Sequence, residues 1–362
     1  MITSLLSRFA LTLVAASIAT AAIAAAVQFP NAAQPQLAAT SDDRVWLAFG
    51  RGQEIYVARS TDQGATFGEP VRVAALPSLM LGRRRGPRIA AHGDRVTITV
   101  MAGELLAFHS KDAGKTWAGP AVVNDVPRSA REGLHGFAAA PDGRLFATWL
   151  DLRDIPGART QLFGAESADG GATWSANRLV YRAPAGQTVC ECCHPSALFN
   201  ARGDLTVMWR NGVDNARDMW SATRPVGTAE FGSAAKLGGG TWLLKACPMD
   251  GGAIFCDGDR AASVWQRDGS VYFCAESQPE QLLGKGTQPV ALTTAQRRFA
   301  VWQQGADLVV ATPGDSAPPR VLARGARFPT LMAIPGTNRV LVAYERVADV
   351  VVAPLDAPLT TP

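Results

Sequence analysis

The sequence has few lysines and no long run of positive charge. Its formal net charge is +4, and the longest basic run is Arg83–Arg85. Lysine occurs only at positions 111, 115, 236, 245 and 285. Proteins that bind nucleic acid usually cluster basic residues on one face. We therefore expect no nucleic-acid partner.

Long apolar runs are also missing, except at the N-terminus. Residues 9–29 carry no charge, follow Arg8, and contain small residues in A-x-A spacing. This pattern is typical of a secretory signal peptide, so we expect residues 1–25 to be one and the protein to be periplasmic or secreted. An uncleaved membrane anchor is the alternative, because the stretch approaches the length of a membrane helix. After cleavage we expect no stable membrane insertion.

Three related strings recur along the first half of the chain: STDQGATF at 60–67, SKDAGKTW at 110–117 and SADGGATW at 167–174. All fit S-x-D-x-G-x-T-[WF], and their spacing of 50 and 57 residues is that of propeller blades. The aspartate accepts hydrogen bonds from backbone N–H groups, the glycine adopts a left-handed conformation, and the aromatic residue packs between sheets. We expect these strings to be structural turns.

A second pattern predicts the number of blades. Seven short apolar segments are each followed by a turn and an alternating strand, beginning near positions 35, 88, 135, 194, 251, 289 and 329. The last unit has only three candidate strands, and Val27–Phe29 can supply the fourth and close the ring. We predict an all-β, seven-bladed β-propeller as a single domain over residues 26–362, with six blades as the alternative.

Most unusual residues fall in loops that a propeller brings to one face. These are the loops at 81–88, 126–136, 186–195 and 241–250, which enter the inner strands, and those at 150–154 and 210–220, which join second to third strands. Polar groups that converge on the loop face of a rigid scaffold usually form a binding site. We expect the functional site on this face.

Three of the six cysteines form a C-x-C-C triplet: Cys190, Cys192 and Cys193. One interpretation is a disulfide between the triplet and Cys247, because the compartment is oxidising. A second is a metal site in which the thiolates and His194, with His135 or Met249, bind copper or zinc. A third is a redox-active thiol pair. The sequence implies no other cofactor.

Cys256 and Cys274 fall on the predicted first and third strands of blade five. Two strand spacings are about 9.5 Å, beyond the roughly 7 Å limit for a disulfide. We expect both to be buried free thiols.

The repeated strings are Asp-boxes, and the chain resembles the sialidase or BNR-repeat family over nearly all of residues 26–362. The strings REGLHGF, ATWLDLRD, CECCHPS and ACPMDGG further resemble an exported bacterial branch of BNR-repeat proteins. The resemblance implies a propeller that binds a glycan or a small anionic ligand. It does not decide whether the protein is an enzyme, because Asp-boxes also occur in propellers without hydrolytic activity.

The resemblance also implies residue roles. Sialidases bind a sugar carboxylate through three arginines. They attack with a tyrosine that a glutamate activates, and an aspartate donates the proton. The segment GPRIAA resembles the family's R-I-P segment without its proline. The ligand-binding residues implied here are Arg88, His135, Asp151, Arg153, Arg217 and Asp218. The catalytic residues implied for an exo-alpha-sialidase-like hydrolase are Tyr344, Glu345 and Asp151.

Each of these residues also has a structural interpretation. Arg153 and Arg217 can pair with the neighbouring carboxylates Asp151, Asp154 and Asp218 to hold loops, and Tyr344 can pack between blades. Glu132, His135, Asp151 and Arg153 can form an acid–base cluster or a network that holds a loop. The sequence therefore leaves three functions open: a glycan-binding or hydrolytic propeller, a metal or redox protein, and a non-catalytic interaction scaffold.

Overall fold

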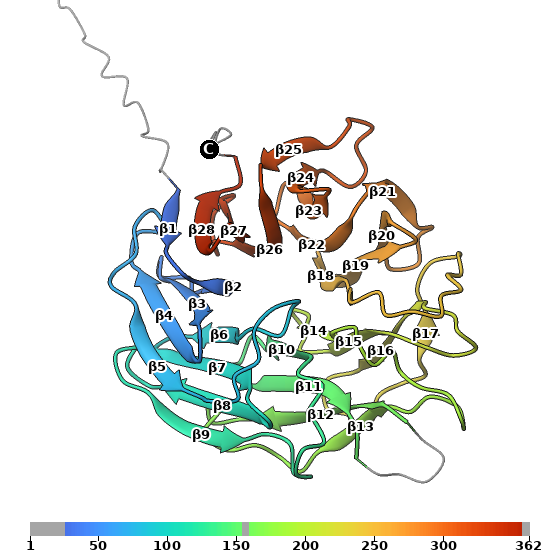
Figure 1. Ribbon diagram of the computed structural model, residues 1–362, viewed down its shortest axis with the longest axis horizontal. Helices are drawn as coiled ribbons and strands as arrows, with labels where there is room; N and C mark the ends of the chain where they lie inside the picture. Colours follow the sequence, from blue (N-terminus) through green and yellow to red (C-terminus); the bar gives the residue numbers. More distant parts are fainter. Residues whose placement is uncertain (1–25, 154–158, 357–362) are drawn as a thin grey trace, which may run out of the picture.

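The computed structural model describes residues 26–153 and 159–356, so the predicted signal peptide and Asp154 lie outside the described residues. The described chain forms seven four-stranded antiparallel sheets around a central axis (Figure 1). The predicted seven-bladed, all-β propeller is confirmed. Within the described residues, no helix is long and apolar enough to cross a membrane.

The first three blades follow one another in chain order. Blade 1 consists of β2 (Ala33–Ala39), β3 (Val45–Arg51), β4 (Glu54–Ser60) and β5 (Val71–Ala75). Blade 2 consists of β6 (Arg88–His92), β7 (Arg95–Met101), β8 (Leu105–Ser110) and β9 (Ala118–Val122). Blade 3 consists of β10 (His135–Ala139), β11 (Leu145–Asp151), β12 (Gln161–Ser167) and β13 (Arg178–Tyr181).

The next three blades repeat this order. Blade 4 consists of β14 (Ser196–Phe199), β15 (Leu205–Arg210), β16 (Met219–Arg224) and β17 (Ala235–Lys236). Blade 5 consists of β18 (Ala253–Asp257), β19 (Arg260–Arg267), β20 (Ser270–Ala275) and β21 (Gln281–Lys285). Blade 6 consists of β22 (Thr287–Thr293), β23 (Arg298–Gln304), β24 (Asp307–Ala311) and β25 (Arg320–Ala323).

Blade 7 joins the two ends of the chain. It consists of β26 (Ala326–Ala333), β27 (Val340–Arg346), β28 (Asp349–Pro354) and β1 (Val27–Phe29). Strand β1 pairs antiparallel with β28, with Val27 opposite Val352 and Phe29 opposite Val350. The predicted ring closure is confirmed, and it covers the edge that β28 would otherwise expose.

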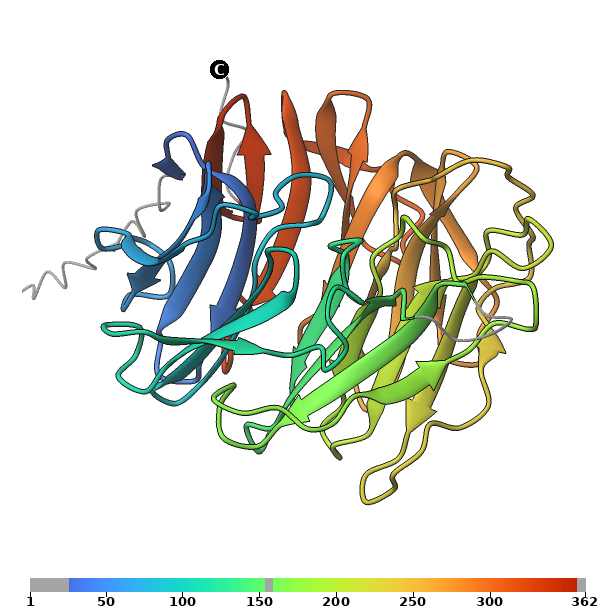
Figure 2. The same ribbon diagram turned by 60° about the horizontal axis from the view of Figure 1, so that its bottom comes forward.

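The first strand of each blade lies beside the axis. Each contacts the first strand of the next blade, and β26 contacts β2 to complete the circle (Figures 1 and 2). The second strands are almost wholly buried, and five of them carry a fully buried tryptophan: Trp46, Trp149, Trp209, Trp265 and Trp302. The core therefore lies between the blades, and residues of the first strands line the axis.

The Asp-boxes occupy the turns between third and fourth strands, as predicted. In blade 3, Asp169 accepts hydrogen bonds from the Thr173 N–H (3.0 Å) and hydroxyl (2.6 Å) and from the Ser167 hydroxyl (2.8 Å). Gly171 has a φ of +87°, and its N–H donates to Ser167 Oγ (2.8 Å). These bonds stabilise the turn itself. Because the turns between third and fourth strands lie on the face opposite the loops that enter the first strands, the Asp-boxes lie away from those loops.

Candidate functional site

The loop face gathers the predicted residues on one side of the ring. Here the loop face means the loops that enter the first strands together with those that join second to third strands. Val189, beside the cysteine triplet, donates its N–H to Thr160 O (3.1 Å) on the connection that follows Arg153. The triplet and Arg153 therefore share one face, as the sequence predicted.

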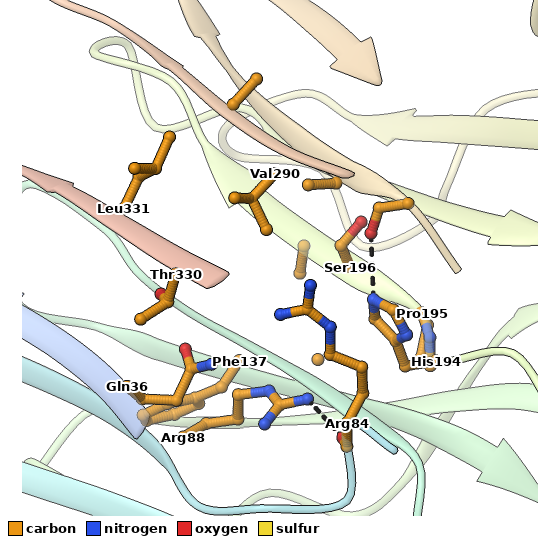
Figure 3. Close-up of a pocket in the computed structure, with 15 residues that line it drawn as sticks. Gln36, Arg84, Arg88, Phe137, His194, Pro195, Ser196, Val290, Thr330 and Leu331 are labelled. Atoms are coloured by element: carbon orange, nitrogen blue, oxygen red, sulfur yellow. Dashed lines mark hydrogen bonds between the residues drawn. The ribbon is translucent and has the colours of Figure 1, made fainter. Parts of the chain in front are cut away.

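The centre of the ring holds a cavity of about 190 Å³. It is lined by residues from the first strand of every blade, together with Arg84, His194, Pro195 and Gly252 (Figure 3). The polar side chains of the lining are Gln36, Arg84, Arg88, His194, Ser196 and Thr330. Arg88 alone among them was predicted to bind a ligand, and His194 was predicted as a metal ligand.

Arg88 brings a positive charge to this cavity without a carboxylate to balance it. Its Nη1 donates to Gly86 O and Pro87 O (both 3.1 Å), and its Nη2 donates to Arg84 O (2.7 Å). Within the described residues, no hydrogen bond uses its Nε–H and no ion pair includes it. Burial, with repulsion from Arg84, lowers the pKa of Arg88 to about 9. All three hydrogen-bond acceptors of the Arg88 guanidinium are thus neutral backbone carbonyls.

Arg84 crosses the channel from the loop before blade 2. Its Nε donates to Gln288 Oε1 (2.9 Å) and its Nη2 to Gln288 O (3.0 Å) in blade 6. Its Nη1 donates to Pro329 O (2.8 Å) in blade 7. Burial lowers the pKa of Arg84 to about 10, although the charges of Asp250 and Glu345 oppose this shift. Arg84 was not among the residues predicted from the sequence, where its only signal was the arginine run Arg83–Arg85.

Ser196 and His194 are two further polar groups of the cavity. The Ser196 hydroxyl is buried and has no hydrogen-bond partner among the described residues. The His194 Nε2 lies 3.0 Å from Gly252 O, and burial together with the charges of Arg84 and Arg88 lowers the pKa of His194 well below its usual value. His194 is therefore neutral near pH 7, and its Nε2–H donates to this carbonyl.

Asp151 and Arg153 form a local pair outside the cavity. Asp151 Oδ1 accepts from the Arg153 Nε (2.8 Å), and its Oδ2 accepts from the Trp149 Nε1 (2.8 Å). Arg153 also reaches Asp125 (3.2 Å) and lies 3.7 Å from the centre of the Phe163 ring. These contacts satisfy both charges, so the structure agrees with the loop-holding interpretation of this pair.

Arg217 and Asp218 also lie outside the cavity. Asp218 pairs with Lys236 (2.8 Å) and accepts the Trp242 N–H (2.9 Å). The Arg217 Nε donates to Leu244 O (3.2 Å). Of Arg88, Arg153 and Arg217, only Arg88 is among the described residues that line the central cavity.

His135 is fully buried beside the channel. Its Nε2 lies 3.0 Å from the Thr99 Oγ1, and its Nδ1 has no partner among the described residues. Burial and the charge of Arg88 lower the pKa of His135 well below its usual value. No hydrogen bond in the described chain joins His135 to Asp151 or to Glu132, so the acid–base cluster stays a prediction from the sequence.

Tyr344 and Glu345 are neighbours on β27, and successive side chains of a strand point to opposite faces. Tyr344 is 3% exposed and packs in the core between blades 6 and 7. Glu345 accepts the Gln34 N–H and Nε2–H (both 2.8 Å) and the Arg327 Nε–H (2.9 Å). Glu345 therefore links blades 7 and 1, and neither side chain lines the central cavity.

The cysteine triplet is buried next to the end of β15. The Cys190 Sγ lies 3.7 Å from the Cys192 Sγ and 3.3 Å from the Cys193 Sγ. Hydrogen bonding with these two thiols lowers the pKa of Cys190, and the nearby charge of Arg217 contributes. Met249 packs against the triplet.

Every described cysteine is a free thiol, so the predicted disulfide to Cys247 is absent from the structure. Cys247 is exposed and does not belong to the sulfur cluster. Cys256 and Cys274 lie on β18 and β20 with β19 between them, as predicted. Cys274 is buried, but Cys256 is only half-buried, which corrects that part of the prediction.

No protein-family model matches the sequence, and no curated protein matches it. Similar solved structures include an ulvan lyase bound to -[GlcA(1-4)Rha3S]- (TM-score 0.55, 12% identity, covering 90% of this chain and 95% of that chain). They also include an inactive virginiamycin B lyase from Staphylococcus aureus bound to quinupristin (TM-score 0.55, 12% identity, covering 91% and 98%). The Hadza microbial sialidase Hz136 matches more weakly (TM-score 0.48, 12% identity, covering 86% and 76%). At these identities the likeness is one of fold.

Proposed function

We propose that the protein is an exported propeller that binds a small anionic saccharide, with Arg88 holding its carboxylate in the central cavity. The observation that carries this proposal is the guanidinium of Arg88, which faces the cavity with only backbone carbonyls as hydrogen-bond acceptors. Charges that are largely withdrawn from water are normally paired because their desolvation is costly. A bound anion supplies the missing negative charge.

The chemistry of the lining favours a carboxylate over a cation or a neutral ligand. The free Nε–H of Arg88 points to charge-assisted hydrogen bonding, which is shorter and stronger than bonding between neutral groups. The Ser196 hydroxyl lacks a partner and can donate to the same ligand. No aspartate, glutamate or tyrosine is among the described residues that line the cavity.

The size of the cavity limits the ligand. Its volume of about 190 Å³ is below the roughly 300–1,000 Å³ of pockets for drug-sized ligands. We therefore propose one sugar unit, such as a uronic or sialic acid. The ulvan lyase bound to -[GlcA(1-4)Rha3S]- gives an example of this fold with an acidic saccharide ligand.

The proposal is binding and not hydrolysis. Glycoside hydrolysis of the usual kind needs two carboxylates on either side of the scissile bond. The described lining offers none, and Tyr344 lies in the core. Sialidase activity therefore stays a prediction from the sequence resemblance, to be checked with a fluorogenic sialoside.

Isothermal titration calorimetry tests the proposal. The protein purified from the exported fraction is titrated with D-glucuronate, N-acetylneuraminate and, as a neutral control, D-glucose. We expect one molecule of at least one acid to bind and glucose not to bind. Arg88→Met is expected to weaken binding roughly 10- to 100-fold, the value of a charged hydrogen bond.

Arg83→Met is the matched control, because Arg83 is exposed in the same loop. It is expected to bind as the unmodified protein does. Equal affinity for glucose and glucuronate, or undiminished affinity in Arg88→Met, would overturn the proposal.

A further inference from the structure

The cysteine triplet is a second cluster of reactive groups that the proposed saccharide site does not use. Cys190, Cys192 and Cys193 are 0%, 7% and 1% exposed, and none of them lines the central cavity. Their sulfur atoms all lie within 4.8 Å of one another. Within the described residues, no other group of three such side chains lies as close together.

The spacing of the sulfur atoms fits a shared metal ion. Metal–sulfur bonds of about 2.3 Å place three sulfur ligands about 3.8–4.0 Å apart in tetrahedral or trigonal geometry. The Cys190–Cys192 distance of 3.7 Å is close to this value, and the Cys190–Cys193 distance of 3.3 Å is a few tenths of an ångström shorter. A small rotation of one thiol is enough to admit the ion.

The backbone holds the triplet in place. Val189 forms an isolated β-bridge with Asn211, and the Cys190 N–H donates to Arg210 O (2.9 Å) at the end of β15. Two anchored residues therefore fix the start of the turn that carries all three thiols. This arrangement orders the ligands before any ion arrives, which lowers the entropic cost of binding.

The side chain packed against the triplet is a methionine and not a histidine. Met249, from the loop that enters blade 5, packs against the three cysteines. His194 follows the triplet in sequence but lines the central cavity, where its Nε2 bonds to Gly252 O. His135 bonds to Thr99. The described donor set is therefore the three cysteine sulfurs, with Met249 packed beside them.

We propose that Cys190, Cys192 and Cys193 bind one Cu(I) ion, with Met249 as a thioether neighbour of the ion. Thiolate and thioether are soft ligands that select Cu(I), which accepts three of them. A structural zinc site usually needs four cysteine or histidine ligands, and this cluster offers three.

The local charge agrees with this assignment. Three thiolates and one Cu(I) carry a net charge of −2, which is costly to bury alone. The positive charges of Arg217 and Arg210 act on Cys190 and Cys193, respectively. These two arginines offset the excess negative charge of the loaded site.

The test uses Cu(I) alone, under anaerobic conditions, on protein purified with a reductant. Competition with a chromophoric Cu(I) chelator measures stoichiometry and affinity, and ultraviolet absorption reports thiolate-to-copper bonds. We expect one Cu(I) per chain. Cys190→Ser and Cys193→Ser are expected to weaken binding at least about 100-fold, and Met249→Leu about 10-fold, as for supporting groups of metal sites.

Cys256→Ser and Cys247→Ser are matched controls, because both thiols lie outside the cluster. They are expected to bind copper as the unmodified protein does. Saccharide binding at Arg88 and the thermal melting curve show whether each variant is folded. No 1:1 complex, preferential binding of zinc over Cu(I), or loss of binding in Cys247→Ser would overturn the proposal.

Discussion

Arg84 and Gln288 lie 204 positions apart and share two hydrogen bonds across the centre of the ring, one to the Gln288 side chain and one to its backbone oxygen. Gln288 is in turn held by Asp250, whose Oδ2 accepts the Gln288 N–H (2.6 Å). Blade 2 is thereby joined to blade 6 through the channel. This link positions the loop that carries Arg88.

Arg84→Met should lower the free energy of unfolding by about 2–4 kcal/mol, because it leaves buried carbonyl acceptors without donors. Urea unfolding followed by tryptophan fluorescence measures this change. Arg83→Met, in an exposed neighbour, should change stability by less than about 0.5 kcal/mol. Equal stability of the two variants would contradict the role given to Arg84.

Glu345→Ala should destabilise the closure between blades 7 and 1 by about 2–4 kcal/mol, because both nitrogens of Gln34 lose their acceptor. Glu345→Gln keeps one acceptor oxygen and should cost about 1 kcal/mol. Thermal or urea unfolding separates the two variants. A smaller loss for Ala than for Gln would rule out this account of Glu345.

Asp169 should make the free energy of unfolding depend on pH in the acidic range. Burial alone would raise its pKa, but hydrogen bonds from Thr173 and Ser167 lower it to about 2 from an ordinary 3.8. The folded protein therefore binds this proton less readily than the unfolded chain. The resulting stability is complete above about pH 4 and is lost as the pH falls through about 2.

Asp169→Asn should accordingly cost about 1 kcal/mol at pH 7, a value reduced by the partial exposure of the turn. The difference from the unmodified protein should shrink as the pH approaches 2. Urea unfolding between pH 2.5 and 7 measures it, and Asp259→Asn, in an exposed turn, is the control. A pH-independent difference would mean that the Asp169 charge is not involved.

Thiol labelling distinguishes the free cysteines of the structure from the disulfide that the sequence also allowed. In the folded protein, an aromatic disulfide reagent should label Cys247 fast, because it is exposed, and the triplet slowly. After unfolding, all six cysteines should react. Only four reactive thiols after unfolding would show that a disulfide exists.

The fold could be predicted from the sequence because its determinants are local. The hydrogen bonds of each Asp-box aspartate join residues at most four positions apart, and the alternating strands that follow each turn are visible as a period of two. The missing strand of the last unit was enough to predict the pairing of β1 with β28.

The site could be predicted only in part, because its contacts are long-range. Arg88 was proposed as a ligand-binding residue from a motif, and it lines the cavity. The partners of Arg84 lie in blades 6 and 7, and no local pattern reveals them. For Arg153 the sequence left two roles open, because a charge pair two residues apart has the same sequence whether it holds a loop or binds a ligand. Tyr344 and Glu345 look like a reactive pair, but strand geometry separates their side chains.

The most direct test of the central claim is a crystal structure of the protein with D-glucuronate at a concentration well above its dissociation constant. The account predicts a sugar in the central cavity, with a carboxylate oxygen within about 3 Å of the Arg88 guanidinium, a charge-assisted hydrogen bond. A sugar bound elsewhere on the loop face, with Arg88 still bonded only to backbone carbonyls, would contradict it.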